Sequence, residues 1–271
     1  IMFTQQPKTS GANPKLRWMD AHCHLSDDAF DDDRDEIYRE LLENQITGLV
    51  LAGTEPKDWH KQKELSPPFP LRIARVFGMH PWWVDQYSDE DLQHALNVLQ
   101  NSLSECQGLG EMGLDYFRAK SPEDRTRQRH WFEAQLKIAR SIDLPIILHI
   151  VRAHHEAIPI LRKQRRTFRG TIHSFWANAQ TAQSYLDMGF LLSVPPRIMK
   201  EDPHNLLRLD PNSLVFETDT PYVDAQNQTV RPTLIHEILE FVAKARGEDV
   251  NLTVRRQEQL LSDLFPILKD H

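Results

Sequence analysis

Cysteine is scarce in this chain, with only Cys23 and Cys106 among 271 residues. A small secreted fold held together by disulfides needs more cysteines than this, so that class of protein is excluded. Two cysteines are typical of a protein kept in a reducing compartment, and we expect a cytoplasmic location.

Long apolar runs are also missing. No stretch approaches the roughly 20 apolar residues that a membrane helix needs, so we expect no membrane association. Residues 1–17 are polar and lack the apolar core of a secretory signal. We interpret them as an extension ahead of a single domain that spans residues 18–271.

Basic residues are outnumbered, since 32 lysines and arginines face 39 aspartates and glutamates, for a net charge of -7. A protein that binds nucleic acid over a broad surface is usually basic, so that kind of interface is not expected. An acidic enzyme can still bind phosphate through metal, because two divalent ions would add about four positive charges to one pocket.

Short apolar runs recur along the chain, each followed by a helical or loop stretch, which is the pattern of βα units. No glycine-rich phosphate turn follows the first run, so the pattern favours a single (β/α)₈ TIM barrel over an open dinucleotide-binding sheet. The clearest helix is expected at 122–142, and two closing helices at 232–244 and 252–264. The expected strands are 18–24, 47–53, 72–78, 107–113, 145–151, 170–175, 190–194 and 213–219.

Metal-capable side chains stand at the ends of five of these strands. His22 and His24 are two residues apart, so both imidazoles are expected on one face while Ala21 and Cys23 face the surrounding helices. A single histidine at such a position is more often a hydrogen-bonded core residue, but a whole set is hard to explain in that way. The other members are Glu111, His149, His173, Glu217 and Asp219.

Parallel strands of a barrel all end at one face, so these side chains would gather in one mouth. So many buried imidazoles and carboxylates conflict with one another unless a cation is present. We therefore predict two divalent ions, with Zn²⁺, Mn²⁺ or Mg²⁺ as the candidates. One ion would lie on His22, His24 and Asp219.

The second ion would lie on His149 and His173, and Glu111 would bridge the pair at the spacing of two-metal sites. Such a pair lowers the pKa of a shared water molecule. We expect Asp219 to accept the proton of that water as it attacks the substrate.

The motifs MDAHCHL, GMHP, GEMGLDY, DLPIILH, GTIHSF and ETDTPY, in this order and spacing, resemble the TatD-related deoxyribonucleases of the amidohydrolase superfamily. The resemblance extends from residue 18 to residue 265. It implies a metal-dependent (β/α)₈ barrel that hydrolyses phosphodiester bonds in DNA, commonly as an exonuclease on single strands. It also implies the ligand set already named.

Two further roles come from the resemblance. His80 in GMHP would face the substrate at a phosphate or the leaving group, whereas the residues alone favour a loop histidine held by Pro81. Glu217 would either orient the ligands from behind or cap the barrel mouth. The family's polar positions after the fifth strand are displaced here, because Ile150 and Val151 precede Arg152.

Several aromatic and basic residues are candidates for contact with DNA. Bases stack on exposed aromatic rings, although each ring has the alternative of packing under a loop. Segments 174–177 and 229–232 also depart from the family pattern, and neither contains a ligand. The candidate substrate contacts are Trp82, Tyr116, Arg152 and Trp176, with Trp83, Phe117 and Arg118 as neighbours of the same kind.

Two charged stretches are interpreted separately from these candidate substrate contacts. The basic run from Arg162 to Arg169 is read as a solvated helix end rather than a DNA track. The acidic stretch from Asp27 to Glu36 would repel a long nucleic acid if it lay at the mouth, which favours the end of a strand as substrate.

Two other functions are compatible with the same metals. One is an amide or ester hydrolase, such as an aminoacyl-tRNA deacylase, because fold and ligands do not separate these chemistries. The other is a catalytically weak metal-binding partner subunit, which the intact ligand set argues against. Protein partners are not indicated by any feature of the sequence.

Overall fold

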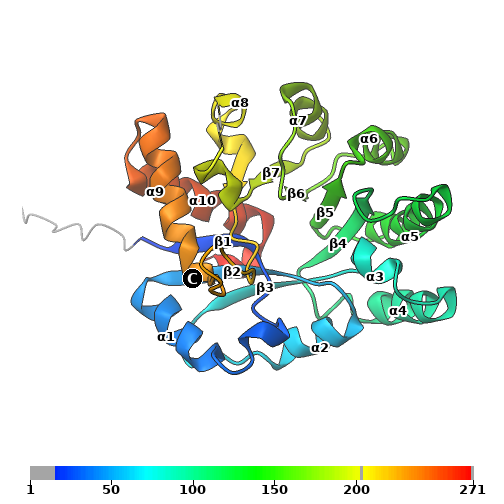
Figure 1. Ribbon diagram of the computed structural model, residues 1–271, viewed down its shortest axis with the longest axis horizontal. Helices are drawn as coiled ribbons and strands as arrows, with labels where there is room; N and C mark the ends of the chain where they lie inside the picture. Colours follow the sequence, from blue (N-terminus) through cyan, green and yellow to red (C-terminus); the bar gives the residue numbers. More distant parts are fainter. Residues whose placement is uncertain (1–15, 202–203, 270–271) are drawn as a thin grey trace, which may run out of the picture.

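The computed structural model describes residues 16–201 and 204–269. Eight parallel strands form one sheet in which each strand pairs with the next along the chain, and every strand is followed by at least one helix (Figure 1). Backbone hydrogen bonds from His24 N to Thr220 O (2.7 Å) and from Asp219 N to His22 O (2.9 Å) join the first strand to the segment after the last. The sheet is therefore a nearly closed barrel, and the predicted fold class is confirmed.

The strands agree with the predicted ones to within a few residues. The strands are β1 (Trp18–Cys23), β2 (Ile46–Ala52), β3 (Arg72–Phe77), β4 (Gly108–Asp115), β5 (Ile146–Val151), β6 (Gly170–His173), β7 (Leu191–Val194) and β8 (Leu214–Phe216). The last strand is shorter than expected: pairing stops at Phe216, so Asp219 lies in the loop that follows.

The longest helix forms where the sequence predicts it. Ser121 and Asp124 make a capping box, in which the serine side chain accepts from the Asp124 backbone and the Asp124 side chain accepts from the Ser121 backbone, ahead of Pro122 at the first turn. The helices are α1 (Arg34–Glu43), α2 (Pro56–Glu64), α3 (Pro81–Val84), α4 (Asp89–Asn101), α5 (Pro122–Arg140), α6 (His154–Lys163), α7 (Ala179–Leu186), α8 (His204–Leu207), α9 (Ile235–Arg246) and α10 (Val250–Leu264).

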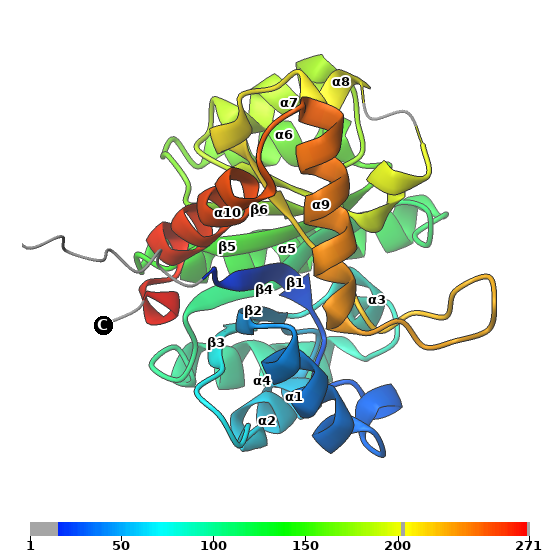
Figure 2. The ribbon, with the colours of Figure 1, turned by 90° about the vertical axis from the view of Figure 1, so that its left-hand side faces the viewer.

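The interior of the barrel is apolar only at the end where the strands begin. There α10 and the turn after it close the barrel, on the side of the molecule opposite the Val223–Thr229 hairpin that follows β8 (Figure 2). The metal-capable side chains are thereby left at the other end, where the strands finish. The interior cluster contains Met19, Ala21, Val50, Ala74, Val76, Ile147, Val215, Leu261, Leu264, Phe265 and Leu268.

The prediction for Ala21 was wrong. Cys23 packs in the outer layer between strands and helices as expected, but Ala21 belongs to the interior cluster. The pairing of β1 with β2 is irregular between Asp20 and Cys23, so strict alternation of side chains fails at this point. The irregularity lets Ala21 and His22, which are neighbours in sequence, both lie inside the barrel.

The predicted boundary between the N-terminal extension and the domain lies between residues 17 and 18. Residues 1–15 lie outside the described part of the chain, but Arg17 is anchored to the domain, with Nη1 3.0 Å from Glu258 Oε1 and Nη2 3.0 Å from Leu268 O. Arg17, which the prediction assigned to the extension, therefore contacts the domain. Within the described residues, no helix has the length and apolar character required to cross a membrane. The cytoplasmic location stays a prediction.

A histidine between β5 and α7 should make folding stability sensitive to mild acid. His154 is mostly buried, its Nδ1 lies 2.9 Å from the Tyr185 hydroxyl, and burial together with His155 lowers its pKa to about 4 from 6.5. Because the unfolded chain takes up the proton first, stability present above pH 6.5 is lost as the pH falls toward 4. We expect His154→Asn to reduce the loss of unfolding free energy between pH 7 and pH 5 by about 1 kcal/mol.

Urea unfolding of both proteins at the two pH values measures this difference. His130→Asn, at an exposed position of α5, is the control and should leave the pH dependence of the wild type in place. If the unfolding free energies of the wild type and the His154 variant depended equally on pH, His154 would not be the cause of the loss of stability in mild acid.

Candidate metal centre

The carboxylate of Glu111 lies at the centre of the barrel mouth, between two groups of imidazoles. Its Oε1 is 3.2 Å from His22 Nε2 and 3.3 Å from His24 Nε2. Its Oε2 is 3.4 Å from His149 Nδ1 and 3.5 Å from His173 Nε2. One buried carboxylate, only 1% exposed, therefore faces a different pair of imidazoles with each of its oxygens.

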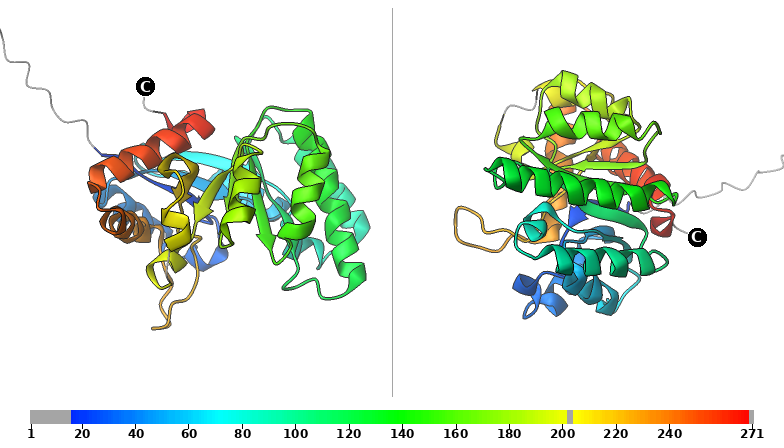
Figure 3. Two further views of the ribbon diagram at one scale, coloured as in Figure 1. Left: turned by 90° about the horizontal axis from the view of Figure 1, so that it is seen from above. Right: turned by 90° about the vertical axis from the view of Figure 1, so that its right-hand side faces the viewer.

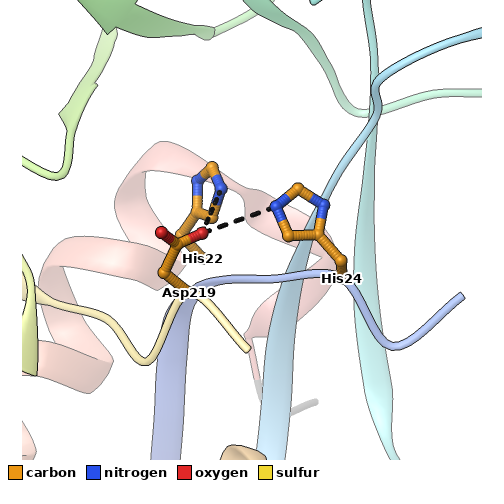
Figure 4. Close-up of side chains that lie close together, drawn as sticks. All are labelled: His22, His24 and Asp219. Atoms are coloured by element: carbon orange, nitrogen blue, oxygen red, sulfur yellow. Dashed lines mark ion pairs between the residues drawn. The ribbon is translucent and has the colours of Figure 1, made fainter. Parts of the chain in front are cut away.

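Asp219 completes the first group and also reaches toward the second. Its Oδ1 is 3.7 Å from His22 Nε2 and 3.5 Å from His24 Nε2 (Figure 4). Its Oδ2 is 3.9 Å from His173 Nε2. The side chain is 38% exposed, whereas the imidazoles are largely covered, so Asp219 is the charged member of the set most open to a substrate.

The backbone at these strand ends adopts an unusual conformation. Arg152 after β5, Ser174 after β6 and Asp219 after β8 have φ values of 54°, 48° and 54°, in the left-handed region that L-residues other than glycine seldom occupy. Such conformations persist where the surrounding structure holds them, and they concentrate at functional sites.

Two of the imidazoles are oriented by a contact at the ring nitrogen that faces away from Glu111. His24 Nδ1 lies 3.0 Å from the carbonyl oxygen of Ala52 and donates to it. His173 Nδ1 lies 2.9 Å from Glu217 Oε1. In both rings the contact at Nδ1 leaves Nε2 as the nitrogen that faces the central carboxylate, the arrangement of histidines that bind metal.

Glu217 is fully buried and is held by three donors. Its Oε1 accepts from Ser174 N at 2.7 Å and faces His173, and its Oε2 accepts from the Ser193 hydroxyl. Its oxygens are therefore already occupied by protein donors. Of the two roles considered for Glu217, the geometry favours the one that orients His173 from behind over a cap at the open mouth.

His80 is close to the centre but is oriented as a donor. It caps α3, where its Nδ1 accepts from Trp82 N at 3.0 Å, so a neutral ring carries its proton on Nε2. That Nε2 is 3.2 Å from His149 Nδ1 and 3.6 Å from Glu111 Oε2. Burial and the neighbouring His149 hold the pKa of His80 well below its usual value. His80 thus presents a neutral N–H to the mouth.

Comparison with known proteins identifies the family. The model of the TatD related DNases matches residues 19–266, almost the whole of the described domain. The chain belongs to the TatD-related DNase family. It is therefore a metal-dependent hydrolase.

Individual members of the family are similar to this chain over nearly its whole length, at low sequence identity. The human protein named deoxyribonuclease TATDN3 is 27% identical, with 93% of this chain and 95% of the relative covered. The Salmonella typhimurium protein named 3'-5' ssDNA/RNA exonuclease TatD is 29% identical, with 92% and 99% covered. The crystal structure of the TatD homologue YjjV from Escherichia coli superposes with a TM-score of 0.80 at 24% identity, with 93% and 98% covered, and supports the fold.

The donor set of this TatD-related site fits divalent cations. Within the described residues, both ring nitrogens of His22 and Glu111 Oε2 are buried without a hydrogen-bond partner. Buried polar atoms are normally paired, so the unpartnered His22 Nε2, which lies 3.2 Å from Glu111 Oε1 and 3.7 Å from Asp219 Oδ1, fits a cation held between these atoms. Imidazole nitrogens mixed with carboxylate oxygens suit Zn²⁺ or Mn²⁺ better than Mg²⁺.

The charges of the ligand set also indicate a cation. Burial lowers the pKa of His24 and His173, but the carboxylates around them outweigh it and raise the values to about 9 and about 10. Burial raises the pKa of Glu111, but His22, His173 and His80 bring it well below the ordinary range. Without metal, protons on the imidazoles neutralise the carboxylates. Metal binding would displace those protons, because a ligating histidine must be neutral.

Two residues of the site were missed in the sequence. Asp20 is fully buried and accepts from His22 N (3.1 Å), Thr218 N (3.0 Å) and the Thr218 hydroxyl (2.5 Å), so it ties β1 to the segment that carries Asp219. Burial raises its pKa to about 7. Asp20 lies in MDAHCHL, and the predicted barrel places the eighth strand beside the first, but the sequence does not show that the Asp20 carboxylate turns toward Thr218.

Asp115 is the second residue that the sequence analysis missed, although its spacing from Glu111 could have indicated it. It follows Glu111 by four residues in β4, and an even separation in a strand places both side chains on one face. Its Oδ2 is 3.3 Å from His149 Nε2 and also accepts from the Trp82 indole, while Oδ1 accepts from Phe117 N at 2.9 Å. One carboxylate thus orients a ligand and fixes an aromatic wall of the mouth.

Removing this carboxylate should weaken metal binding. We expect Asp115→Asn to lower the affinity of the group around His149 for metal by about 10- to 100-fold, because the imidazole is then without the charged partner that sets its orientation. Isothermal titration calorimetry of metal-free protein with Mn²⁺ measures the effect. Asp187→Asn, on an exposed carboxylate that accepts from Gln183 at the C-terminal end of α7, is the control. Identical titrations of Asp115→Asn and the wild type would contradict the role.

The remaining predicted contacts are distributed around the mouth. A pocket of about 690 Å³ covers the ligands and is lined by Trp82, which is 41% exposed, and by Trp83. Trp176 is partly buried against the core and lies under Arg197, whose guanidinium is 4.9 Å from its ring centre. Arg152 is exposed and lines the next groove along the barrel rather than the pocket over the ligands.

The structure does not place Tyr116 at the pocket, which corrects that prediction. Its ring is only 6% exposed, its hydroxyl is 3.4 Å from Arg129 Nη1, and the Arg125 guanidinium covers its face at 4.8 Å. The next residue, Phe117, is 56% exposed instead. At the end of β4 one aromatic ring must pack against α5, and the neighbour then points outward.

Proposed function

We propose that this TatD-related protein is a two-metal phosphodiesterase that removes nucleotides from an end of single-stranded DNA. The observation that carries the proposal is the position of Glu111, whose two oxygens face separate pairs of imidazoles within 3.5 Å. A bridging carboxylate of this kind is the usual feature of two-metal hydrolases.

The ions would be held by protein groups whose nitrogen and oxygen atoms already point inward. His22, His24 and Asp219 would hold one ion. His149 and His173 would hold the other, and Glu111 would contact both. Divalent ions bound there would acidify a water molecule and polarise a phosphodiester oxygen.

The chain's own side chains would handle the protons. Asp219 is ionised, since His173 and His24 outweigh burial and lower its pKa to about 2, and it is open to the pocket. It would accept the proton of the attacking water. His80 would donate its Nε2 proton in a hydrogen bond to a phosphate oxygen or to the leaving group, because its other nitrogen is held by Trp82 N.

The walls of the pocket support the end of a strand as substrate. Asp27 and Glu55 line one side, while Arg197 and Lys200 line another, where Glu201 Oε1 lies 2.7 Å from Arg197 Nε. A phosphate backbone is attracted to Lys200 and repelled by the acidic side, so a strand that enters past Lys200 would stop at the metals. Trp82 offers an exposed ring for a base.

Metal reconstitution tests the proposal. Protein stripped of metal should be inactive, and adding Mn²⁺, Zn²⁺ or Mg²⁺ should restore stepwise shortening of an end-labelled single-stranded oligonucleotide. A circular single strand of the same length should resist, since it has no end. Cleavage of the circle would overturn the exonuclease mode. Turnover of a carboxylic ester with no cleavage of DNA under any metal would favour the amide or ester hydrolase instead.

A further inference from the structure

A second groove, of about 540 Å³, lies on the outside of the barrel between α6 and α7, which run side by side (Figures 1 and 3). Arg152, His155 and Arg162 line its α6 side together with the apolar Ile158 and Pro159, and hydroxyl and amide side chains line its α7 side. Within the described part of the chain, no carboxylate lines this groove. The residues used below are Arg152, His155, Arg162, Gln180, Thr181 and Ser184.

The positive charges of the two arginines in the groove are not balanced by carboxylates among the described residues. Arg162 Nη2 lies 3.3 Å from the neutral Ser184 hydroxyl, and neither Arg152 nor Arg162 takes part in an ion pair with any described residue. The nearby Glu156 is neutralised by Arg129 at 2.6 Å, with His155 at 3.8 Å. A basic groove of this kind is unusual on a chain of net charge -7 and indicates an anionic occupant.

Arg162 stands apart from the rest of the basic run in which it lies. Arg166 Nη1 donates to Ala139 O at 2.8 Å, and Arg169 Nη2 donates to Asp263 O at 3.1 Å, so both satisfy carbonyls at helix ends. Arg162 lies in the last turn of α6, as the interpretation of the run as a helix end expects, and its side chain also lines the groove.

Two stacked pairs of side chains, one at the metal pocket and one at the groove, are joined by the neighbouring residues Phe117 and Arg118. The Arg118 guanidinium lies 3.7 Å from the ring centre of Trp82, which lines the pocket. The Arg152 guanidinium lies 4.8 Å from the ring centre of Phe117, and Arg152 lines the groove. Alternating aromatic rings and guanidinium groups are the surface on which single-stranded nucleic acids stack their bases and place their phosphates.

We propose that the groove between α6 and α7 binds the phosphate backbone of a single-stranded substrate, beyond the nucleotides at the metals, with Phe117 and Arg152 carrying the strand from one to the other. The inference rests on the proposed function, since it extends the path of that substrate. Arg162 and the hydroxyls of Thr181 and Ser184 would contact phosphates. The groove would raise the efficiency of cleavage for long strands and have no contact with short ones.

Kinetics as a function of substrate length test this path. The metal-loaded enzyme is assayed on oligodeoxynucleotides from 2 to 20 nucleotides long. We expect Arg162→Glu to lower kcat/KM for the longest strand by roughly tenfold relative to the dinucleotide, which reports on the metal centre alone. Arg162→Gln should give a smaller loss. The dependence of log kcat/KM on log salt concentration should become shallower by about 0.7 for each phosphate that the variant no longer neutralises.

Arg255→Glu is the matched control, because Arg255 is an exposed arginine on α10, at the opposite end of the barrel from the metals. It should reproduce the length profile of the wild type. A wild-type length profile in both Arg162 variants would overturn the groove while leaving the exonuclease intact. Absence of cleavage of both the dinucleotide and the long strand by the wild type would instead overturn the proposed function.

Discussion

Replacing Glu111 by glutamine is expected to lower kcat/KM for a single-stranded oligonucleotide by at least about 10³-fold, equivalent to about 4 kcal/mol of transition-state stabilisation. Glutamine has nearly the same shape, but it is neutral and turns an N–H₂ group toward one of the two imidazole groups. It cannot contact two cations at once. Metal analysis of the purified variant should therefore find at most one ion per chain, where we expect two in the wild type.

Glu133→Gln makes the same chemical change at an exposed position of α5 and should retain both metal and activity. The thermal unfolding of metal-free Glu111→Gln should show a single cooperative transition, which separates loss of metal from loss of the fold. A folded variant that kept two ions and full activity would exclude Glu111 as the bridge.

Replacing Asp219 by asparagine should lower kcat by about 10³-fold, within the range for loss of a general base, even at saturating metal. The reason is that the amide can still fill the space beside His22 and His24 but cannot take up a proton. Metal affinity should fall as well, since a charged ligand is removed, so activity must be measured over a range of metal concentrations. Recovery of the wild-type rate at high metal would show that Asp219 is only a ligand.

Asp224→Asn, in the hairpin that follows, is the control for this change. Asp224 Oδ1 accepts from Gln226 N at 2.9 Å and from Gln228 N at 2.8 Å, and an asparagine oxygen can accept in the same way. This variant should have the activity of the wild type. Together the two aspartates separate an effect at the metals from a general effect on the loop between β8 and α9.

The sequence alone was sufficient for the barrel and for the gathering of the predicted ligands. Short apolar runs with helical stretches between them specify parallel strands, and parallel strands end at one face. Any His, Glu or Asp at such an end must then lie at the mouth. That argument is local and periodic, so it succeeded for His149 and His173, whose strands pair in register. It failed for Ala21, because an irregular strand pairing has no periodic signature.

The tertiary structure decided which atoms of these side chains face one another. A ring nitrogen becomes available to metal when its partner nitrogen is held by Ala52, Glu217 or Asp115, and such contacts join residues from 28 to 44 positions apart. It also decided that Phe117 rather than Tyr116 is exposed, and that Arg152 and Arg162 share a groove with α7. Residue type and strand order determine where a group lies along a barrel, whereas orientation and charge compensation depend on neighbours that only folding brings together.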